Sequence, residues 1–255
     1  MNHRARKRFG QHFLTAPEVI EQIVSTIDPR EGEVIVEIGP GQAAITEPLS
    51  YLASELHAVE FDRDLVAALG ARFATRENVI IHEADALSFD FSSIGNKLRI
   101  VGNLPYNIST PLLFRLLDFE DSIIDMHFML QKEVVDRICA QPGTKAFGRL
   151  TVMLGCRMES VPLFDVGPEA FSPPPKVMSS VLRLRPLPKE HFALAQPERL
   201  EQLVKLAFSR RRKTLRNALQ GLVDTADIEA AGLDATARPE QVPIESWVKL
   251  ANRVA

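Results

Sequence analysis

The sequence has little cysteine and no long apolar run, and each absence excludes a class of protein. Its two cysteines, Cys139 and Cys156, stand apart without a Cys-x-x-Cys spacing, which suits a reducing cytosol and argues against a disulfide framework. No uninterrupted apolar run reaches the roughly 18 residues of a membrane span. The basic start, Met1–Gly10, lacks an apolar stretch and is not typical of a secretory signal. We expect a cytoplasmic protein with no membrane-spanning segment.

Signatures of metal and phosphoryl-transfer chemistry are missing as well. The histidines other than His12 show no metal-ligand spacing, and no glycine-rich loop carries a Walker-type lysine. We therefore expect no metal cofactor. With 255 residues, of which 45% are hydrophobic, the chain is long enough for one large α/β domain and a small second domain.

The net charge is small, but the basic residues are unevenly distributed. A net charge of −3 argues by itself against a nucleic-acid partner. However, Arg4–Arg8 holds four basic residues and the segment Lys205–Arg216 holds six, and neither contains an acidic residue. This separation predicts basic patches on an acidic body, as in proteins that contact a phosphate backbone. From charge alone, two solvated charge runs remain the alternative. We call Lys205–Arg216 the basic segment.

Short apolar runs alternate with helical patterns through the first 130 residues. The helical patterns include Asp64–Phe73 and Thr110–Leu117. Alternation of this kind predicts a doubly wound, mostly parallel α/β sheet with helices on both faces. The expected strands are Val34–Ile38, Leu56–Phe61, Val79–His82, Leu98–Gly102 and Asp125–Leu130, with a later one at Ser180–Leu184.

A polar, proline-rich segment, Arg185-Pro-Leu-Pro-Lys-Glu190, predicts a domain boundary. Beyond it, apolar residues recur at helical spacing from Leu200 to Phe208 and again from Leu215 to Leu222. We therefore predict an α/β domain over residues 1–186 and a small all-helical domain over residues 187–255.

The ends of the first two expected strands carry features of a nucleotide site. The first strand ends in Glu37-Ile-Gly-Pro-Gly41, where glycine lets the backbone approach a ligand across the carboxyl ends of parallel strands. Glu60 ends the second strand, about 20 residues after Gly39, where a carboxylate can accept hydrogen bonds from both ribose hydroxyls. Sites for NAD and for S-adenosylmethionine share these features, so an NAD-dependent oxidoreductase stays open here.

Asp85, just after the third expected strand, favours S-adenosylmethionine. A carboxylate at this place can accept a hydrogen bond from the exocyclic amine of the adenosine end of that cofactor. An ordinary turn or N-cap role is the alternative for Asp85.

The motif Gly102-Asn-Leu-Pro-Tyr-Asn107 follows the fourth strand and suits methylation of adenine N6. That nitrogen is a poor nucleophile because its lone pair is delocalised into the ring. Hydrogen-bond acceptors at the Asn103 side chain and the Leu104 carbonyl would favour a pyramidal nitrogen with a localised lone pair. Pro105 stiffens the turn, and Tyr106 offers a face on which a flipped base can stack. Because stacking needs only the ring, Tyr106→Phe is expected to stay active. An oxidoreductase would leave this motif unexplained.

Six segments resemble the ribosomal RNA adenine dimethyltransferase family, with the best likeness to the bacterial type acting on small-subunit RNA. They run from residue 8 to residue 217 and so cover most of the chain. The segments are Arg8-Phe-Gly-Gln-His-Phe-Leu14, Val36-Glu-Ile-Gly-Pro-Gly41, Val101-Gly-Asn-Leu-Pro-Tyr-Asn-Ile-Ser-Thr110, Met129-Leu-Gln-Lys-Glu-Val134, Phe171-Ser-Pro-Pro-Pro-Lys-Val177 and Ser209-Arg-Arg-Arg-Lys-Thr-Leu-Arg-Asn217.

The resemblance implies a Rossmann-like methyltransferase domain that uses S-adenosylmethionine, followed by a helical domain that binds RNA or the ribosome. It implies dimethylation of N6 of two adjacent adenosines in a hairpin near the 3′ end of 16S RNA. The substrate would be a precursor of the small ribosomal subunit, which gives the enzyme a role in ribosome biogenesis. We expect it to act as a monomer. No general base is needed, because the methylated N6 ammonium is acidic enough to lose its proton to water.

The resemblance also assigns site residues. Phe171 would close over the second face of the target adenine, with core packing as the alternative. His12 stands where the family commonly has asparagine, and a surface position is the alternative. The cofactor contacts are His12, Leu14, Gly39, Gly41, Glu60, Asp85 and Asn103, and the catalytic residues are Asn103, Leu104, Pro105, Tyr106 and Phe171. The expected RNA contacts are Arg6, Lys7, Arg8, Arg210, Arg211, Arg212, Lys213 and Arg216.

Two further alternatives remain. A sister enzyme that methylates large-subunit RNA shares the asparagine-proline-tyrosine turn, but such enzymes tend to be strongly basic, whereas this chain has a pI near 6.1. A ribosome-assembly factor could also bind RNA without catalysis, although the complete motifs argue against lost activity.

Overall fold

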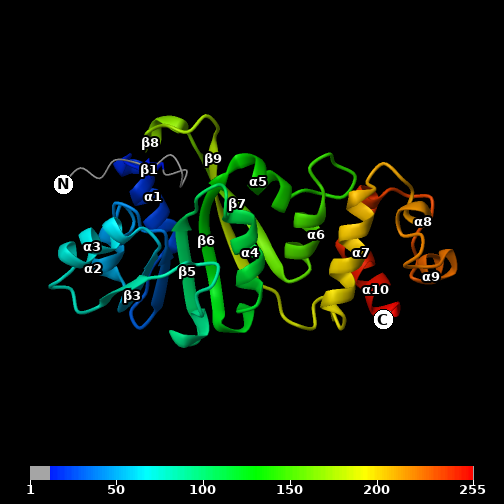
Figure 1. The fold of residues 1–255 in the computed structure, drawn as a ribbon, viewed down its shortest axis with the longest axis horizontal. Coiled ribbons are helices and arrows are strands. Elements are labelled where there is room, and N and C mark those ends of the chain that lie inside the picture. Colours follow the sequence, from blue (N-terminus) through cyan, green and yellow to red (C-terminus); the bar gives the residue numbers. More distant parts are fainter. Residues whose placement is uncertain (1–11, 255) are drawn as a thin grey trace. The chain divides into compact units, whose positions relative to one another are not determined.

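The computed structural model describes residues 12–254, which form two compact units (Figure 1). Unit 1 runs up to Val135 and resumes at Val161–Pro186, and unit 2 comprises Asp136–Ser160 and the chain from Leu187 onward. Unit 1 thus ends at the residue where the sequence places the domain boundary. The sequence analysis assigned residues 136–160 to the first domain, and the structure corrects this. In that stretch, α6 (Arg149–Gly155) packs its buried side chains on helices that follow residue 187.

Unit 1 is built on a seven-stranded sheet with the order β4-β3-β2-β5-β6-β9-β7. Strands β4, β3, β2, β5 and β6 are parallel, and β9 is antiparallel to β6. All six expected strands are present, whereas β7 and a separate two-stranded sheet were not predicted. The strands are β2 (Val34–Ile38), β3 (Glu55–Glu60), β4 (Val79–Glu83), β5 (Leu98–Asn103), β6 (Ile123–Gln131), β7 (Met158–Val166) and β9 (Ser179–Pro186), and the small sheet pairs β1 (Phe13–Leu14) with β8 (Phe171–Ser172).

Helices follow the strands of unit 1 as the alternation predicts. Pro48 lies in the first turn of its helix, where the missing N–H removes no helical hydrogen bond. The Asp62 side chain caps α3 by accepting a hydrogen bond from the Asp64 N–H at 3.1 Å. The helices that begin in unit 1 are α1 (Pro17–Ile27), α2 (Thr46–Leu52), α3 (Arg63–Arg72), α4 (Ser109–Leu117) and α5 (Lys132–Ile138), with short 3-10 turns at Phe91–Ser93, Glu120–Ser122 and Pro168–Ala170.

Unit 2 is mainly helical, and its core is the predicted apolar face of α7 (Pro197–Ser209). Leu200, Leu203 and Val204 are fully buried there, and α7 packs against α10 (Ile244–Arg253), which buries Trp247. The remaining elements are α8 (Leu215–Ala218), α9 (Thr225–Ala230) and a 3-10 turn at Pro239–Gln241. Within residues 12–254 no helix has both the length and the apolar character needed to cross a membrane.

Candidate active site

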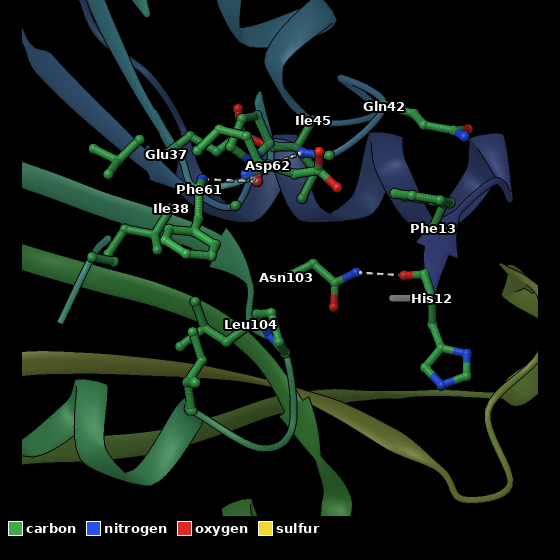
Figure 2. Close-up of a pocket in the computed structure, with 18 of the residues that line it drawn as sticks. His12, Phe13, Glu37, Ile38, Gln42, Ile45, Phe61, Asp62, Asn103 and Leu104 are labelled. Atoms are coloured by element: carbon green, nitrogen blue, oxygen red, sulfur yellow. Dashed lines mark hydrogen bonds between the residues drawn. The ribbon is translucent and has the colours of Figure 1, made fainter. Parts of the chain in front are cut away.

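A cavity of about 290 Å³ lies in unit 1 where the parallel strands β2, β3 and β5 end (Figure 2). The carboxyl ends of parallel strands meet at one edge of a sheet, which is where α/β proteins bind ligands. The cavity brings together all of the cofactor contacts expected from the sequence and most of the catalytic residues. From those two sets its lining includes His12, Leu14, Gly39, Gly41, Glu60, Asp85, Asn103, Leu104, Pro105 and Tyr106.

Glu60 ties the glycine loop, Gly39–Gly41, to the end of β3. Its Oε1 atom accepts hydrogen bonds of 2.9 Å from the backbone N–H groups of Phe61 and Asp62, and its Oε2 atom accepts one of 3.2 Å from Gly41. The side chain is buried, and this burial raises the pKa of Glu60 in spite of these donors. Glu60 is therefore a fixed acceptor at the cavity wall.

Glycine is required where the loop and β5 approach other backbone. Gly41 has a φ of +57°, and a Cβ atom there would also come within 3.2 Å of the Phe13 ring. At Gly102, on β5, a Cβ atom would lie 2.5 Å from the Ile38 carbonyl oxygen. A larger residue at either position would force these neighbouring atoms to shift.

Asp85 is exposed and makes the turn contact that was one of the two roles weighed from the sequence. Its Oδ1 atom accepts a hydrogen bond of 2.9 Å from the Leu87 N–H, which makes it a turn residue. Because it also lines the cavity, its carboxylate remains accessible to a ligand. The turn contact is therefore compatible with the predicted cofactor role.

Asn103, the last residue of β5, has its amide orientation fixed. The Nδ2 atom donates a hydrogen bond of 3.1 Å to the His12 carbonyl oxygen. Figure 2 shows the amide nitrogen directed at that carbonyl and the side-chain oxygen turned away from it. The Asn103 Oδ1 atom is thereby held as an acceptor, and the next residue, Leu104, is buried under the turn.

His12 and Tyr106 lie against each other at the same end of the cavity. Their rings are stacked, with centroids 5.9 Å apart and planes inclined by 28°. The His12 Nδ1 atom donates to the Pro173 carbonyl oxygen at 2.7 Å, and the Tyr106 and Ser179 hydroxyls share a hydrogen bond of 3.0 Å. His12 is thus half-buried and part of the cavity wall, and its contact with the cofactor stays a prediction.

Phe171 does not lie where the resemblance places it. Its ring is 4% exposed and belongs to a buried cluster that includes Leu14 and Val181, and it is absent from the cavity lining. The reason is the β1–β8 pairing, which sets Phe171 opposite Leu14. In this structure the ring packs in the core, and the expectation that it faces the target base is corrected.

Among the lining residues that sequence reasoning did not assign are Glu37 and Phe61. Glu37 is 2% exposed, and its Oε2 atom has no hydrogen-bond partner among residues 12–254. Burial, reinforced by the nearby Glu60 charge, raises the pKa of Glu37 to about 7. A carboxylate inside an otherwise apolar parallel strand was the available signal. The Phe61 ring is 60% exposed and directly follows Glu60.

The lining separates into a charged end and a neutral end. The four carboxylates Glu37, Glu60, Asp62 and Asp85 line one end, and no lysine or arginine of residues 12–254 contributes to the lining. The turn from Asn103 to Tyr106 supplies amide, carbonyl and aromatic groups at the other end. The charged end suits a cationic ligand with hydroxyl and amine groups, and the neutral end suits a planar base.

In unit 2 the lysine and arginine side chains of the basic segment fall into two groups. Arg211 binds the Glu240 carboxylate at 3.4 Å and the Thr144 carbonyl oxygen at 3.3 Å, and Arg210 donates to the Ala218 carbonyl oxygen at 3.3 Å. The other four are exposed, and their side chains have no partner within residues 12–254: Lys205, Arg212, Lys213 and Arg216. A groove runs along Ser209–Lys213, Asn217 and Gln220. The predicted RNA contacts Arg6, Lys7 and Arg8 lie outside the described residues.

Comparison with known proteins decides the family. The family model described as ribosomal RNA adenine dimethylase matches residues 2–255. The chain belongs to this family. A ribosomal RNA small subunit methyltransferase A of Dechloromonas aromatica is 53% identical over 250 residues, which cover 98% of each protein. Membership confirms the predicted enzyme class, an rRNA adenine methyltransferase.

Solved structures give the same fold. A dimethyladenosine transferase from Plasmodium falciparum superposes with a TM-score of 0.82 at 24% identity, covering 94% of this chain and 96% of that one. The 23S rRNA methyltransferase ErmE superposes with a TM-score of 0.71 at 27% identity, covering 95% of this chain and 99% of that one. The Rossmann-like α/β class predicted from the sequence is thereby confirmed.

Proposed function

We propose that the chain transfers methyl groups from S-adenosylmethionine to N6 of two adjacent adenosines in a hairpin near the 3′ end of 16S RNA. The observation that carries this proposal is that one cavity holds both the four carboxylates and the Asn103–Tyr106 turn. A methyl donor and a target adenine can therefore lie next to each other in one cavity, which is the main requirement when positioning drives the reaction.

The charged end fits the cofactor by its chemistry. When bound, S-adenosylmethionine supplies an electrophilic methyl group on a positively charged sulfur. Glu60, fixed by three backbone N–H groups, would accept the ribose hydroxyls, and Asp85 would accept the adenine amine. Glu37, buried and without a hydrogen-bond partner for its Oε2 atom within the described residues, offers negative charge to a cationic ligand.

The neutral end fits the target base. The Asn103 Oδ1 atom and the Leu104 carbonyl would accept the two N6 hydrogens and localise the nitrogen lone pair. The bond from Asn103 Nδ2 to the His12 carbonyl prevents the amide from presenting its nitrogen to the base. Tyr106 supplies the stacking face, and the proton released from N6 goes to water.

The exposed lysine and arginine side chains of the basic segment would hold the RNA. Arg212, Lys213 and Arg216 are free of acidic partners within residues 12–254, so each can neutralise a phosphate. The expected contacts Arg6, Lys7 and Arg8 would add to this surface. The 53% identity with a small-subunit enzyme supports 16S RNA as the target over a large-subunit target.

Methylation of isolated subunits tests this proposal. Small subunits that lack the modification, large subunits and free 16S RNA are each incubated with the protein and labelled S-adenosylmethionine, and the modified bases are mapped. We expect four methyl groups per small subunit, on two neighbouring adenosines, and none on large subunits. Labelling confined to large subunits, or to a base other than adenine, would overturn the proposal.

A further inference from the structure

The proline-rich segment Ser172–Ser179 has no role in the function proposed so far, because Phe171, the residue before it, packs in the core. Both ends of the segment nevertheless reach the catalytic turn. At its start, the Pro173 carbonyl accepts a hydrogen bond of 2.7 Å from the His12 imidazole, which stacks on the Tyr106 ring. At the end of the segment, the Ser179 hydroxyl forms a hydrogen bond of 3.0 Å with the Tyr106 hydroxyl.

Ser179 is placed rigidly enough to fix a partner. It is 1% exposed and begins β9, where it lies opposite Gln131 of β6. The preceding residue is held as well, because the Met178 carbonyl accepts a hydrogen bond of 2.9 Å from the Lys132 N–H. A buried hydroxyl needs a hydrogen-bond partner, and for Ser179 the structure provides the Tyr106 hydroxyl.

Tyr106, in contrast, is only half-buried and sits on a turn between β5 and α4. Its ring would be free to pivot if its hydroxyl were not anchored. An aromatic platform must lie flat against the base, and small displacements of reacting groups cost large factors in rate. The hydrogen bond to Ser179 and the stacking of His12 restrict this pivot from two sides.

We propose that Ser179 is a positioning residue for methyl transfer, which acts by holding the Tyr106 ring in the orientation that stacks on the target adenine. The inference rests on the proposed function, because it takes the stacking role of Tyr106 as given. It changes the expectation drawn from the sequence for Tyr106→Phe: the hydroxyl matters through Ser179, although the ring alone makes the stacking contact.

A double-mutant cycle on unmodified small subunits tests the inference. Ser179→Ala and Tyr106→Phe are each expected to lower kcat by about tenfold, the upper range for one neutral hydrogen bond. The double variant should lose no more than either single variant, because both changes remove the same bond. The KM for subunits and the affinity for S-adenosylmethionine, measured by calorimetry, should stay within about twofold of wild type.

Ser180 offers a matched control. It is the next residue of β9 and is equally buried, but its hydroxyl bonds the Phe164 carbonyl at 3.2 Å and does not reach Tyr106. Ser180→Ala should lower the melting temperature about as much as Ser179→Ala while leaving kcat unchanged. An equal loss of kcat in Ser180→Ala, or multiplied losses in the double variant, would overturn the inference.

Tyr106→Ala separates this inference from the function on which it rests. If Tyr106→Ala is inactive while Tyr106→Phe and Ser179→Ala both match wild type, the positioning role of Ser179 is refuted and the stacking role stands. If Tyr106→Ala methylates at the wild-type rate, the proposed function of the turn itself fails.

Discussion

In the cavity of unit 1, functional groups come from strand ends and are buried or hydrogen-bonded in place, whereas Arg212 and Lys213 of the basic segment are exposed and unpaired within the described residues. Glu60 is held by three backbone donors and Asn103 by one acceptor. The first arrangement fixes single atoms in place, and the second leaves positive charge exposed to solvent.

This difference sets the size of the effects to expect. Loss of a fixed group at a reacting atom removes an interaction that nothing else supplies, so catalysis falls steeply. Loss of an exposed cation removes one of several similar contacts, and salt already weakens each of them. Substitutions in the cavity should therefore have large, specific consequences, and substitutions in the basic segment small, diffuse ones.

The largest effect is expected for Asn103→Ala. Removing the acceptor for N6 should lower the single-turnover rate of methylation by roughly 10²–10³, by analogy with the loss of one positioned hydrogen-bonding group at a reacting centre. Binding to small subunits should change little, because the residue contacts the base and not the phosphates. Rapid-quench kinetics and a subunit-binding assay measure the two quantities. Equal losses in rate and binding would make Asn103 a general RNA contact.

Next come the acidic contacts to the cofactor. Glu60→Ala and Asp85→Ala should each weaken S-adenosylmethionine binding by about one to two decades, the typical effect of one lost charge-assisted hydrogen bond. They should differ in stability: Glu60→Ala frees three backbone N–H groups near buried residues, whereas Asp85 is exposed. Calorimetry and thermal unfolding separate the two effects. Wild-type affinity in both variants would remove these residues from the site.

A smaller, pH-dependent effect is expected at Glu37. Burial raises the pKa of Glu37 to about 7, so in the ligand-free cavity at neutral pH it is about half protonated. A cationic ligand favours the ionised form, so wild-type affinity for S-adenosylmethionine should fall about tenfold from pH 8 to pH 6. Glu37→Gln, which mimics the protonated form, should flatten this dependence. An identical pH profile in both proteins would contradict the role of Glu37.

The stability of the ligand-free protein gives an independent measurement of the same residue. The folded pKa of Glu37, about 7, lies above its ordinary value of 4.5, so the folded state loses stability as pH rises from about 4.5 to about 7. The cost is up to about 3 kcal/mol above this window. Glu37→Gln should therefore raise the melting temperature more at pH 8 than at pH 5. An increase that does not depend on pH would indicate a packing effect only.

Much of the cavity could be predicted because its residues follow strand ends. Glu60 and Asn103 each terminate a short apolar run, and parallel strands bring such positions together whatever the details of packing. Glu37 was missed because the glycine loop that follows it drew the functional assignment. Phe171 was misplaced because a motif does not show whether a ring faces a cavity or the core; the short β1–β8 pairing, which decides this, has too few residues to show a strand pattern.

The same limit applies to unit 2. The apolar face of α7 was evident from its spacing, but amphipathic residues before β7 do not tell which unit they pack against, so residues 136–160 were assigned to the first domain. The sequence likewise does not distinguish among the six basic residues of the basic segment. Only the structure shows that Arg210 and Arg211 are engaged by Ala218, Thr144 and Glu240.

The smallest effect per residue is expected in the basic segment. The variants there are chosen among the basic residues that have no bonding partner within the described residues. Arg212→Gln/Lys213→Gln removes two unpaired cations and should lower the slope of log affinity against log salt concentration, for small-subunit binding, by up to about two units. Arg211 is left in place, because its bonds to Glu240 and Thr144 would mix a loss of stability into the result. Affinity for S-adenosylmethionine should not change, because its proposed site lies in unit 1.

A charge-matched control in the same unit is Lys249→Gln/Arg253→Gln on α10. These two cations already face acidic partners, Glu245 at 2.7 Å and Asp227 at 3.3 Å, so their removal should leave the salt slope unchanged. Binding of each variant to small subunits is measured from low to high salt. If the control flattens the slope as much as Arg212→Gln/Lys213→Gln, the effect is one of net charge and the contrast between fixed and exposed groups fails. If neither double variant changes the slope, the basic segment is a solvated surface, and the phosphate contacts must come from elsewhere, with Arg6, Lys7 and Arg8 the next residues to test.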